Sequence, residues 1–276
     1  MERRPSPFLL TLLCVGIAFL YIPMLVLIAY SFNRSALASV WGGFSTRWYA
    51  ELLHNQQILK AAGLSLEVAV GSSSGALVLG TLAAIALVRF SRFRGRLLLT
   101  GMVNAPLVMP EIITGITQLL LFVSMLQLVG WPSRGLTTIV LSHIAFCTAY
   151  VTITVQSRLQ TADRSLEEAA MDLGASPFQA FIDVTLPIIS PALISSWLLS
   201  FTLSLDDLVI SSFVSGPRSS TLPMVIYSKV KLGVSPDINA LASLIICAVG
   251  ACVLVAGYLV RRTERQRFED AQLAAQ

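Results

Sequence analysis

Six long, uninterrupted apolar runs constrain this chain more than any other feature of its sequence. The runs cover residues 8–32, 61–88, 97–129, 136–157, 188–214 and 238–260. A helix of about 20 apolar residues crosses a bilayer core of roughly 30 Å, so each run is long enough to span it. A membrane strand would alternate apolar and polar residues, and these runs do not. The sequence therefore predicts one all-α integral membrane domain, residues 1–276, with six transmembrane helices.

Composition supports a membrane location and excludes several classes of protein. Only 12% of the residues are charged and 55% are hydrophobic, whereas a soluble domain carries about twice that charge. Disordered, fibrous and ordinary soluble proteins are therefore excluded. The basic residues are scattered between the apolar runs, which argues against a nucleic-acid partner. The cysteines, which have no C-x-x-C spacing, are interpreted as small buried apolar residues without a metal or disulfide; they are Cys14, Cys147, Cys247 and Cys252.

The distribution of lysine and arginine predicts the orientation in the membrane. Twelve of the 19 fall at the two termini and in two connections between runs, and they are Arg3, Arg4, Arg89, Arg92, Arg94, Arg96, Arg158, Arg164, Arg261, Arg262, Arg265 and Arg267. By the positive-inside rule, both termini and the 158–187 loop are cytoplasmic, while Trp41 and Lys229 are periplasmic. The first run has 25 residues and no small-x-small cleavage site, so we interpret it as a retained signal anchor.

One glycine pattern and two histidines do not by themselves indicate a functional site. Gly71 and Gly75 form a G-x-x-x-G pattern, which fits either a close approach by another helix or a flexible serine-rich turn. His54 and His143 are isolated in the sequence. We interpret them as surface or packing residues and expect no metal site.

The 158–187 loop carries signals for two short helices. Ser165, followed three residues later by Glu168, is a capping box and predicts a helix start. Gly174 stands where a left-handed residue would end that helix, and Ser176-Pro177 is a second N-cap with proline at the first helical position. We expect a glycine corner between the two helices. The surface there suits a groove of another protein, and a hairpin packed on its own membrane domain is an equal alternative.

The same loop resembles the E-A-A loop of binding-protein-dependent ABC importer permeases, whose pattern is E-A-A-x-x-x-G, nine residues, then I-x-L-P. The matching residues are Glu168, Ala169, Ala170, Gly174, Leu186 and Pro187, with Val184 in place of the usual isoleucine. The resemblance implies the type I ABC importer permease architecture. It also implies a loop that docks into a cytosolic ATPase and transmits closure of the ATPase dimer to the membrane helices.

ATP chemistry is expected from that partner. The chain has no G-x-x-x-x-G-K-[ST] phosphate loop, which is the motif that cradles ATP phosphates in such ATPases. We therefore expect a transport subunit that is not itself an enzyme and binds no cofactor, with ATP and Mg bound by the partner ATPase.

Three further segments resemble the polyamine branch of the family, in particular the second permease subunit of putrescine importers. They are residues 41–49, 105–115 and 201–213. This resemblance implies a second, different permease subunit, two copies of the ATPase and a periplasmic polyamine-binding protein as partners. It places the chain in the lipid bilayer of the bacterial inner membrane.

Three carboxylates within apolar runs are candidates for the substrate pathway: Glu111, Asp206 and Asp207. A rise of about 1.5 Å per residue puts Glu111 roughly 21 Å and Asp206 roughly 27 Å from the cytoplasmic start of their runs. Each acid costs on the order of 3 kcal/mol if unpaired. No lysine or arginine lies within the runs, so we expect no ion pair within the chain at this depth. Protonation, or hydrogen bonding to nearby serine and threonine side chains, is the structural alternative.

The predicted function is that of a permease subunit that moves a polyamine into the cytoplasm by alternating access, and putrescine is the favoured substrate. An importer of the same type for another solute is an alternative within the family, although the acids count against an anion. A secondary transporter or channel that works without ATP would keep the six spans but would have no use for the 158–187 loop. A purely scaffolding membrane protein would leave the buried acids unexplained.

Overall fold

The structure is a computed structural model that describes residues 6–35, 40–90, 92–233 and 236–251, together with Leu254 and Tyr258. Among these residues, five helices are long and apolar enough to cross a membrane. The prediction of an all-α membrane protein is therefore confirmed. The chain divides into two compact units, Gln57–Val225 and the two remaining ends of the chain, and each is described by itself.

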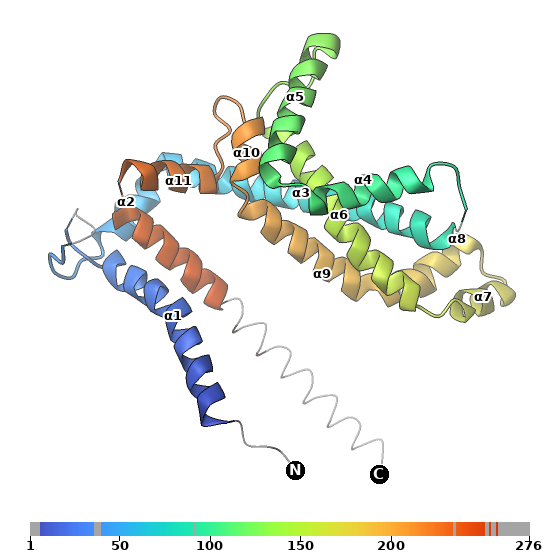
Figure 1. Cartoon of the computed structure of the whole chain (residues 1–276), viewed down its shortest axis with the longest axis horizontal. Coiled ribbons are helices and arrows are strands. Elements are labelled where there is room, and N and C mark those ends of the chain that lie inside the picture. The colour runs from blue at the N-terminus through green and yellow to red at the C-terminus, as the bar shows by residue number, and fades with distance from the viewer. Residues whose placement is uncertain are drawn as a thin grey trace. The chain divides into compact units, whose positions relative to one another are not determined.

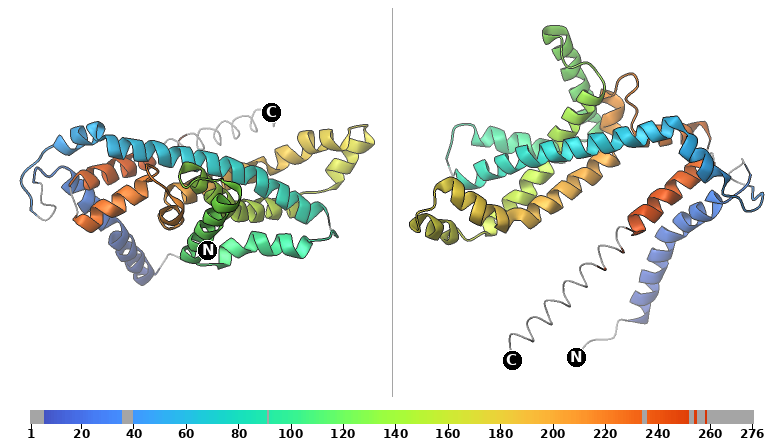
Figure 2. Two further views of the ribbon diagram at one scale, coloured as in Figure 1. Left: turned by 90° about the horizontal axis from the view of Figure 1, so that it is seen from above. Right: turned by 180° about the vertical axis from the view of Figure 1, so that it is seen from behind.

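The unit Gln57–Val225 contains most of the helices. They are α3 (Gln56–Arg89), α4 (Arg96–Val108), α5 (Glu111–Val129), α6 (Leu136–Thr161), α7 (Ser165–Asp172), α8 (Pro177–Ala180), the π-helical turn η1 (Phe181–Thr185), α9 (Leu186–Leu205), α10 (Val209–Val214) and the start of α11 (Leu222–Leu232). Helices α3, α6 and α9 lie side by side, and α7 and α8 lie beyond one end of α6 and α9 (Figures 1 and 2). The 158–187 loop is therefore a helical extension at one end of this unit.

Small residues allow α3 to pack closely on α6. A Cβ atom at Gly75 would lie 2.7 Å from the Ile144 side chain, and one at Gly80 would lie 2.6 Å from Val151. Gly80 has no room for a side chain, because the Val151 Cβ atom is fixed by its backbone, whereas at Gly75 the end of the flexible Ile144 side chain would have to move. The close-approach interpretation of the G-x-x-x-G pattern is confirmed at Gly75. At Gly71 the nearest atom would be 3.8 Å away, which is ordinary contact.

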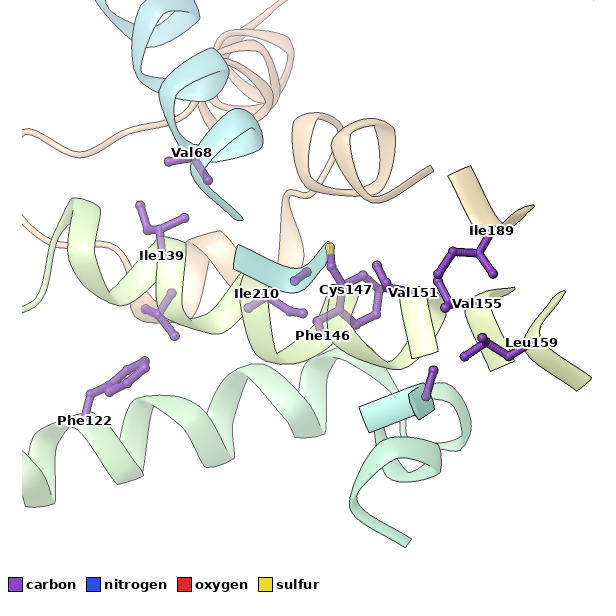
Figure 3. Packing of buried hydrophobic residues seen from close by; sticks show 13 residues of the cluster. Val68, Phe122, Ile139, Phe146, Cys147, Val151, Val155, Leu159, Ile189 and Ile210 are labelled. Carbon is purple, nitrogen blue, oxygen red and sulfur yellow. The ribbon is translucent and has the colours of Figure 1, made fainter. Parts of the chain in front are cut away.

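Apolar side chains from several helices fill the interior of this unit (Figure 3). The core includes Val68 of α3, Ile139 and Val151 of α6, Ile189 of α9 and Ile210 of α10, all at most 1% exposed. Burial of such side chains against one another fixes the three long helices, because interiors of this kind are close-packed.

The third apolar run, expected as one span over 97–129, is two helices. Helix α4 ends at Val108 and α5 begins at Glu111, with Met109 and Pro110 both extended at ψ 136° and 138°. Proline has no N–H to donate and forces the preceding residue out of the helical region, so Met109-Pro110 interrupts the helix. Pro106 stays inside α4. The depth of Glu111, which assumed a continuous helix from residue 97, therefore cannot be taken from a residue count.

The fifth run, expected as one span over 188–214, is also divided. Helix α9 begins at Leu186 and ends at Leu205, and the short α10 begins at Val209. The carboxylate of Asp207 accepts hydrogen bonds from the backbone N–H groups of Ile210 (3.2 Å) and Ser211 (2.8 Å). An aspartate that satisfies the free N–H groups at a helix start favours a new helix at this point.

The second unit contains α1 (Pro7–Ser31), α2 (Arg47–His54), most of α11 and the helix Pro236–Ala251. The Tyr49 hydroxyl joins α1 to the last helix, because it lies 2.6 Å from Ser31 Oγ and donates to Ser243 Oγ at 3.2 Å. Cys14 and Cys247 are exposed. The expectation that they are buried is wrong, since apolar residues on these helices face outward, as lipid-facing helices require.

Some sequence-based predictions concern residues outside the described ranges. They are the end of the sixth run beyond 251, the terminal arginines (Arg3, Arg4, Arg261, Arg262, Arg265 and Arg267) and Cys252.

Candidate functional site

The first short helix of the 158–187 loop ends at a left-handed glycine. Gly174 has φ +97°, and its N–H donates to the Met171 carbonyl, while the Ala175 N–H donates to the Ala170 carbonyl. These two bonds form a Schellman motif, which terminates a helix and satisfies its last carbonyls. The predicted glycine corner is confirmed.

The two predicted N-caps have different outcomes. Ser176 caps α8 by accepting from the Gln179 N–H at 3.3 Å, and the Gln179 side chain accepts from the Ser176 N–H at 2.8 Å. The helix expected to begin at Ser165 is confirmed, whereas the capping box expected at Ser165 and Glu168 is wrong. Ser165 lies inside α7, and its N–H donates to Asp163 at 2.9 Å. That backbone hydrogen bond holds the pKa of the Asp163 carboxyl below its usual range.

Apolar side chains stand exposed around the glycine corner. Leu173 is 90% exposed and Phe178 is 73% exposed, and Met171 and Leu166 are exposed as well. Glu168 and Ala169 are also exposed, and Ala170 is half-buried. A surface on which large exposed apolar side chains surround small residues is typical of a protein-binding site.

One carboxylate oxygen connects this loop to α3. Glu167 Oε1 forms an ion pair with the Arg89 guanidinium at the end of α3 and accepts a hydrogen bond from the Thr185 hydroxyl in η1. Sequence reasoning missed this contact. The only available signal was the adjacent pair Glu167-Glu168. Glu168 belongs to the E-A-A pattern, so Glu167 had no assigned role.

A buried polar cluster lies where α6 faces the break between α9 and α10. His143 Nδ1 lies 2.7 Å from Ser204 Oγ, and Nε2 lies 3.1 Å from both Asp207 Oδ2 and Ser211 Oγ. The cluster continues to α3, because Ser72 donates to Ser204 at 2.8 Å. The side chains of His143 and Asp207 are only 1% and 8% exposed.

This cluster gives one of the buried acids a side-chain partner that the expectation from the sequence did not consider. That expectation counted only lysine and arginine, whereas His143, in the fourth run, provides the partner. The packing interpretation of His143 is confirmed, and its pairing with Asp207 was missed. The signal that could have indicated it is that His143 is the one ionisable nitrogen base within the six runs.

The other two candidate acids have different surroundings. Glu111 is the first residue of α5 and Asp206 follows the last residue of α9, and both are exposed. One turn after Glu111, Gly115 packs against Phe213 of α10. Both acids thus lie at helix breaks that flank the contact of α5 with α10. Among the described residues, no hydrogen bond joins the three acids to one another.

Neither cavities nor metal-binding groups indicate a different site in the part of the chain that is described. A cavity of about 360 Å³ is lined by residues of α3, α4 and α6, including Arg96, Asn104 and Gln156, and by none of the three acids. No group of three or more histidine, cysteine or acidic residues that could hold a metal occurs among the described residues.

The fold and the loop define a helical membrane transport component. A family model described as "Binding-protein-dependent transport system inner membrane component" matches residues 76–268, and the chain belongs to this family. The resemblance of the 158–187 loop to that family is therefore confirmed, as is the inner-membrane location. The chain is a permease subunit of a transport system.

Two relatives cover nearly the whole chain. The putrescine transport system permease protein PotI of Escherichia coli (strain K12) is 56% identical over 270 residues, which cover 98% of this chain and 96% of the relative. The spermidine/putrescine transport system permease protein PotC of the same strain is 44% identical over 246 residues, which cover 89% and 90%. Both relatives are named as transport permeases.

Solved structures support the fold. A chain of a bacterial alginate ABC transporter, in complex with a periplasmic protein bound to an alginate pentasaccharide, has a TM-score of 0.71 at 18% identity and covers 92% of this chain and 93% of its own. A chain of the MetNI methionine ABC transporter has a TM-score of 0.58 at 16% identity and covers 80% and 99%. At these identities the likeness concerns the ABC importer permease fold alone.

Proposed function

We propose that the chain is the permease subunit of an ATP-driven importer for a polyamine, with putrescine as the first substrate to test. The observation that carries this proposal is the similarity over nearly the full length to a putrescine permease, at 56% identity. A second relative, at 44% identity, is named for spermidine and putrescine. Polyamines are therefore the substrate class common to both relatives.

The exposed glycine corner supports docking of a cytosolic ATPase. Glu168, Ala169, Ala170 and Gly174 form an open surface beside the exposed Leu173 side chain. Leu186 and Pro187 begin α9 directly after η1, so a displacement of the loop reaches that helix without an intervening hinge. ATP and Mg bind to the ATPase, and this chain supplies the surface that the ATPase moves.

Membership of this family also supports the composition of the whole transport complex. A second, different permease subunit completes the translocation pathway, two copies of the ATPase bind from the cytoplasm, and a periplasmic binding protein delivers the polyamine. Both termini and the 158–187 loop are cytoplasmic, because these segments and the 89–96 connection together carry 12 of the 19 lysine and arginine residues.

We assign the cation pathway to Glu111 and Asp206, with Asp207 in a supporting role. An ammonium group loses hydration on entering the membrane, and a carboxylate replaces part of it. Asp206 is exposed and follows the carboxyl end of α9, where the helix dipole also favours a cation. Asp207 points to His143 and the start of α10 instead. A diamine has two charges, so two separate acids suit it better than one.

Uptake by the reconstituted complex tests this proposal. Labelled putrescine should enter vesicles only with ATP and the binding protein, and Glu111→Gln and Asp206→Asn should each reduce uptake at least about tenfold while assembly with the ATPase stays normal. Glu51→Gln is the matched control, because it removes an exposed acid that pairs with Arg47 on α2. Uptake of an unrelated solute but not of polyamines, or uptake without ATP, would overturn the proposal.

A further inference from the structure

Three segments of the chain meet at one carboxylate oxygen. Glu167 Oε1 in α7 receives both the Arg89 guanidinium, from the last residue of α3, and the Thr185 hydroxyl, from the last residue of η1. The 158–187 loop is therefore attached to the membrane helices at three places, and one of them is the covalent continuation of α6 into the loop. The second is the covalent continuation of η1 into α9, and the third is this non-covalent contact with α3.

The ion pair is largely shielded from water. The side chains of Arg89 and Glu167 are 16% and 21% exposed, and a mostly apolar cavity of about 350 Å³ beside them is lined by Leu159, Met171 and Phe181 among others. Arg89 Nη1 is buried and has no hydrogen-bond partner among the described residues. A pair in such surroundings is screened less than a surface pair, and removal of one partner leaves the other charge uncompensated.

Helix α3 is placed to carry motion away from this contact. From Arg89 to Ser65 it extends about 36 Å at 1.5 Å per residue, and Gly75 and Gly80 hold it against α6. Ser74 accepts a hydrogen bond from the Trp197 indole of α9 at 3.2 Å. Near the far end, Ser65 Oγ accepts from the Leu222 N–H, at the first residue of α11, at 2.7 Å.

We propose that Arg89 and Glu167 are positioning residues that make α3 an additional, non-covalent connection between the 158–187 loop and the membrane helices. Displacement of the loop by the ATPase then moves α3 together with α9, and α3 transmits it to the Ser65–Leu222 contact. This inference rests on the proposed function, since it requires an ATPase that moves the loop.

The test compares single variants, their combination and a matched control in the assembled complex. Arg89→Gln and Glu167→Gln should each reduce putrescine uptake per ATP hydrolysed by at least about fivefold, the lower end of typical coupling effects, while basal ATP hydrolysis is unchanged. The exchanged pair Arg89→Glu with Glu167→Arg should restore most of the uptake. Arg94→Gln removes the same charge from the exposed α3–α4 connection and should behave as the parent.

The outcomes separate this inference from the proposed function. If the parent transports putrescine and the Arg89 and Glu167 variants transport with parental efficiency, α3 does not transmit the displacement of the loop. If the parent itself takes up no polyamine, the proposed function fails first. Where a single variant does not assemble, Thr185→Val weakens the contact without removing a charge and should still lower uptake per ATP. The inference would be overturned if the Thr185→Val variant took up as much putrescine per ATP as the parent and the exchanged pair did not restore uptake.

Discussion

His143 Nε2 lies 3.1 Å from Asp207 Oδ2, and this pair joins α6 to the start of α10 inside the unit Gln57–Val225. Both side chains are buried, and Ser204 and Ser211 complete the hydrogen bonds of the imidazole. The pair thus lies where the fifth apolar run divides.

Replacing that histidine should destabilise the protein. His143→Ala removes a buried hydrogen-bond partner of both Asp207 and Ser204, so we expect the free energy of unfolding to fall by about 1–3 kcal/mol. Thermal unfolding of the purified protein in detergent measures the change. His54→Ala is the control, since His54 is exposed on α2. Equal unfolding temperatures for the two variants would contradict a structural role for the pair.

The neighbouring aspartates should have separable roles. Asp207→Asn removes the charge that faces His143 and weakens the cap of α10, so we expect lower thermal stability and a lower yield of folded protein. Asp206→Asn changes an exposed side chain, so we expect normal stability and reduced putrescine uptake. Measuring both properties for both variants decides the assignment, and a stable Asp207→Asn protein with the greater transport defect would reverse it.

Close packing of α3 on α6 predicts a contrast between two glycines of one helix. Gly80→Ala would place its Cβ atom 2.6 Å from Val151, whereas Gly71→Ala would meet Val140 at 3.8 Å. Overpacking typically costs about 1–3 kcal/mol, so we expect Gly80→Ala to lower the unfolding temperature and Gly71→Ala to leave it unchanged. A similar result for both variants would show that α3 shifts to accommodate the added methyl group.

The glycine corner should be needed for coupling. Gly174→Val places a β-branched residue at φ +97°, which costs about 1–2 kcal/mol and misdirects α8. We expect normal membrane insertion with loss of ATP-driven uptake. Gly130→Val is the control, because Gly130 is also left-handed at φ +77° but follows α5. Parental uptake by the Gly174 variant would exclude the corner from coupling.

Membrane orientation is testable by cysteine labelling in a background without the natural cysteines. Cysteine in place of Glu168 should be protected from an impermeant thiol reagent in intact cells, and cysteine in place of Trp41 should react. Lys231 is a better second periplasmic position than Lys229, since Lys229 pairs with Asp237. Labelling of position 168 from outside would invert the proposed topology.

Local signals in the sequence predicted much of the fold. Hydrophobic length predicted α1, α3 and α6 to within a few residues, and Gly174 and Ser176 predicted the corner and the second cap, because these features depend on neighbours in the chain. The start of α7 at Ser165 was predicted correctly but its cap was not, since the Ser165 N–H donates to Asp163 and the sequence does not rank the two side chains as caps. The division of the third run required knowing which of two prolines ends a helix.

The candidate site was less predictable, because its contacts join residues far apart in the chain. His143 and Asp207 are 64 residues apart, and Arg89 and Glu167 are 78 apart. No local pattern specifies which histidine or arginine reaches which acid. The sequence indicated the acids through their cost in an apolar run, and only the three-dimensional arrangement of α6, α9 and α10 separates Asp207 from Asp206.

The interruption at Met109-Pro110 has a consequence for the subunit on its own. Helix α4 has 13 residues, about 20 Å at 1.5 Å per residue, which is too short to cross the hydrocarbon core alone. The last carbonyls of α4 and the first N–H groups of α5 have no helical partners, and acyl chains offer none. The break at Met109-Pro110 must therefore be covered by polypeptide or by water. A lone subunit surrounded only by acyl chains therefore leaves backbone groups unsolvated at this break.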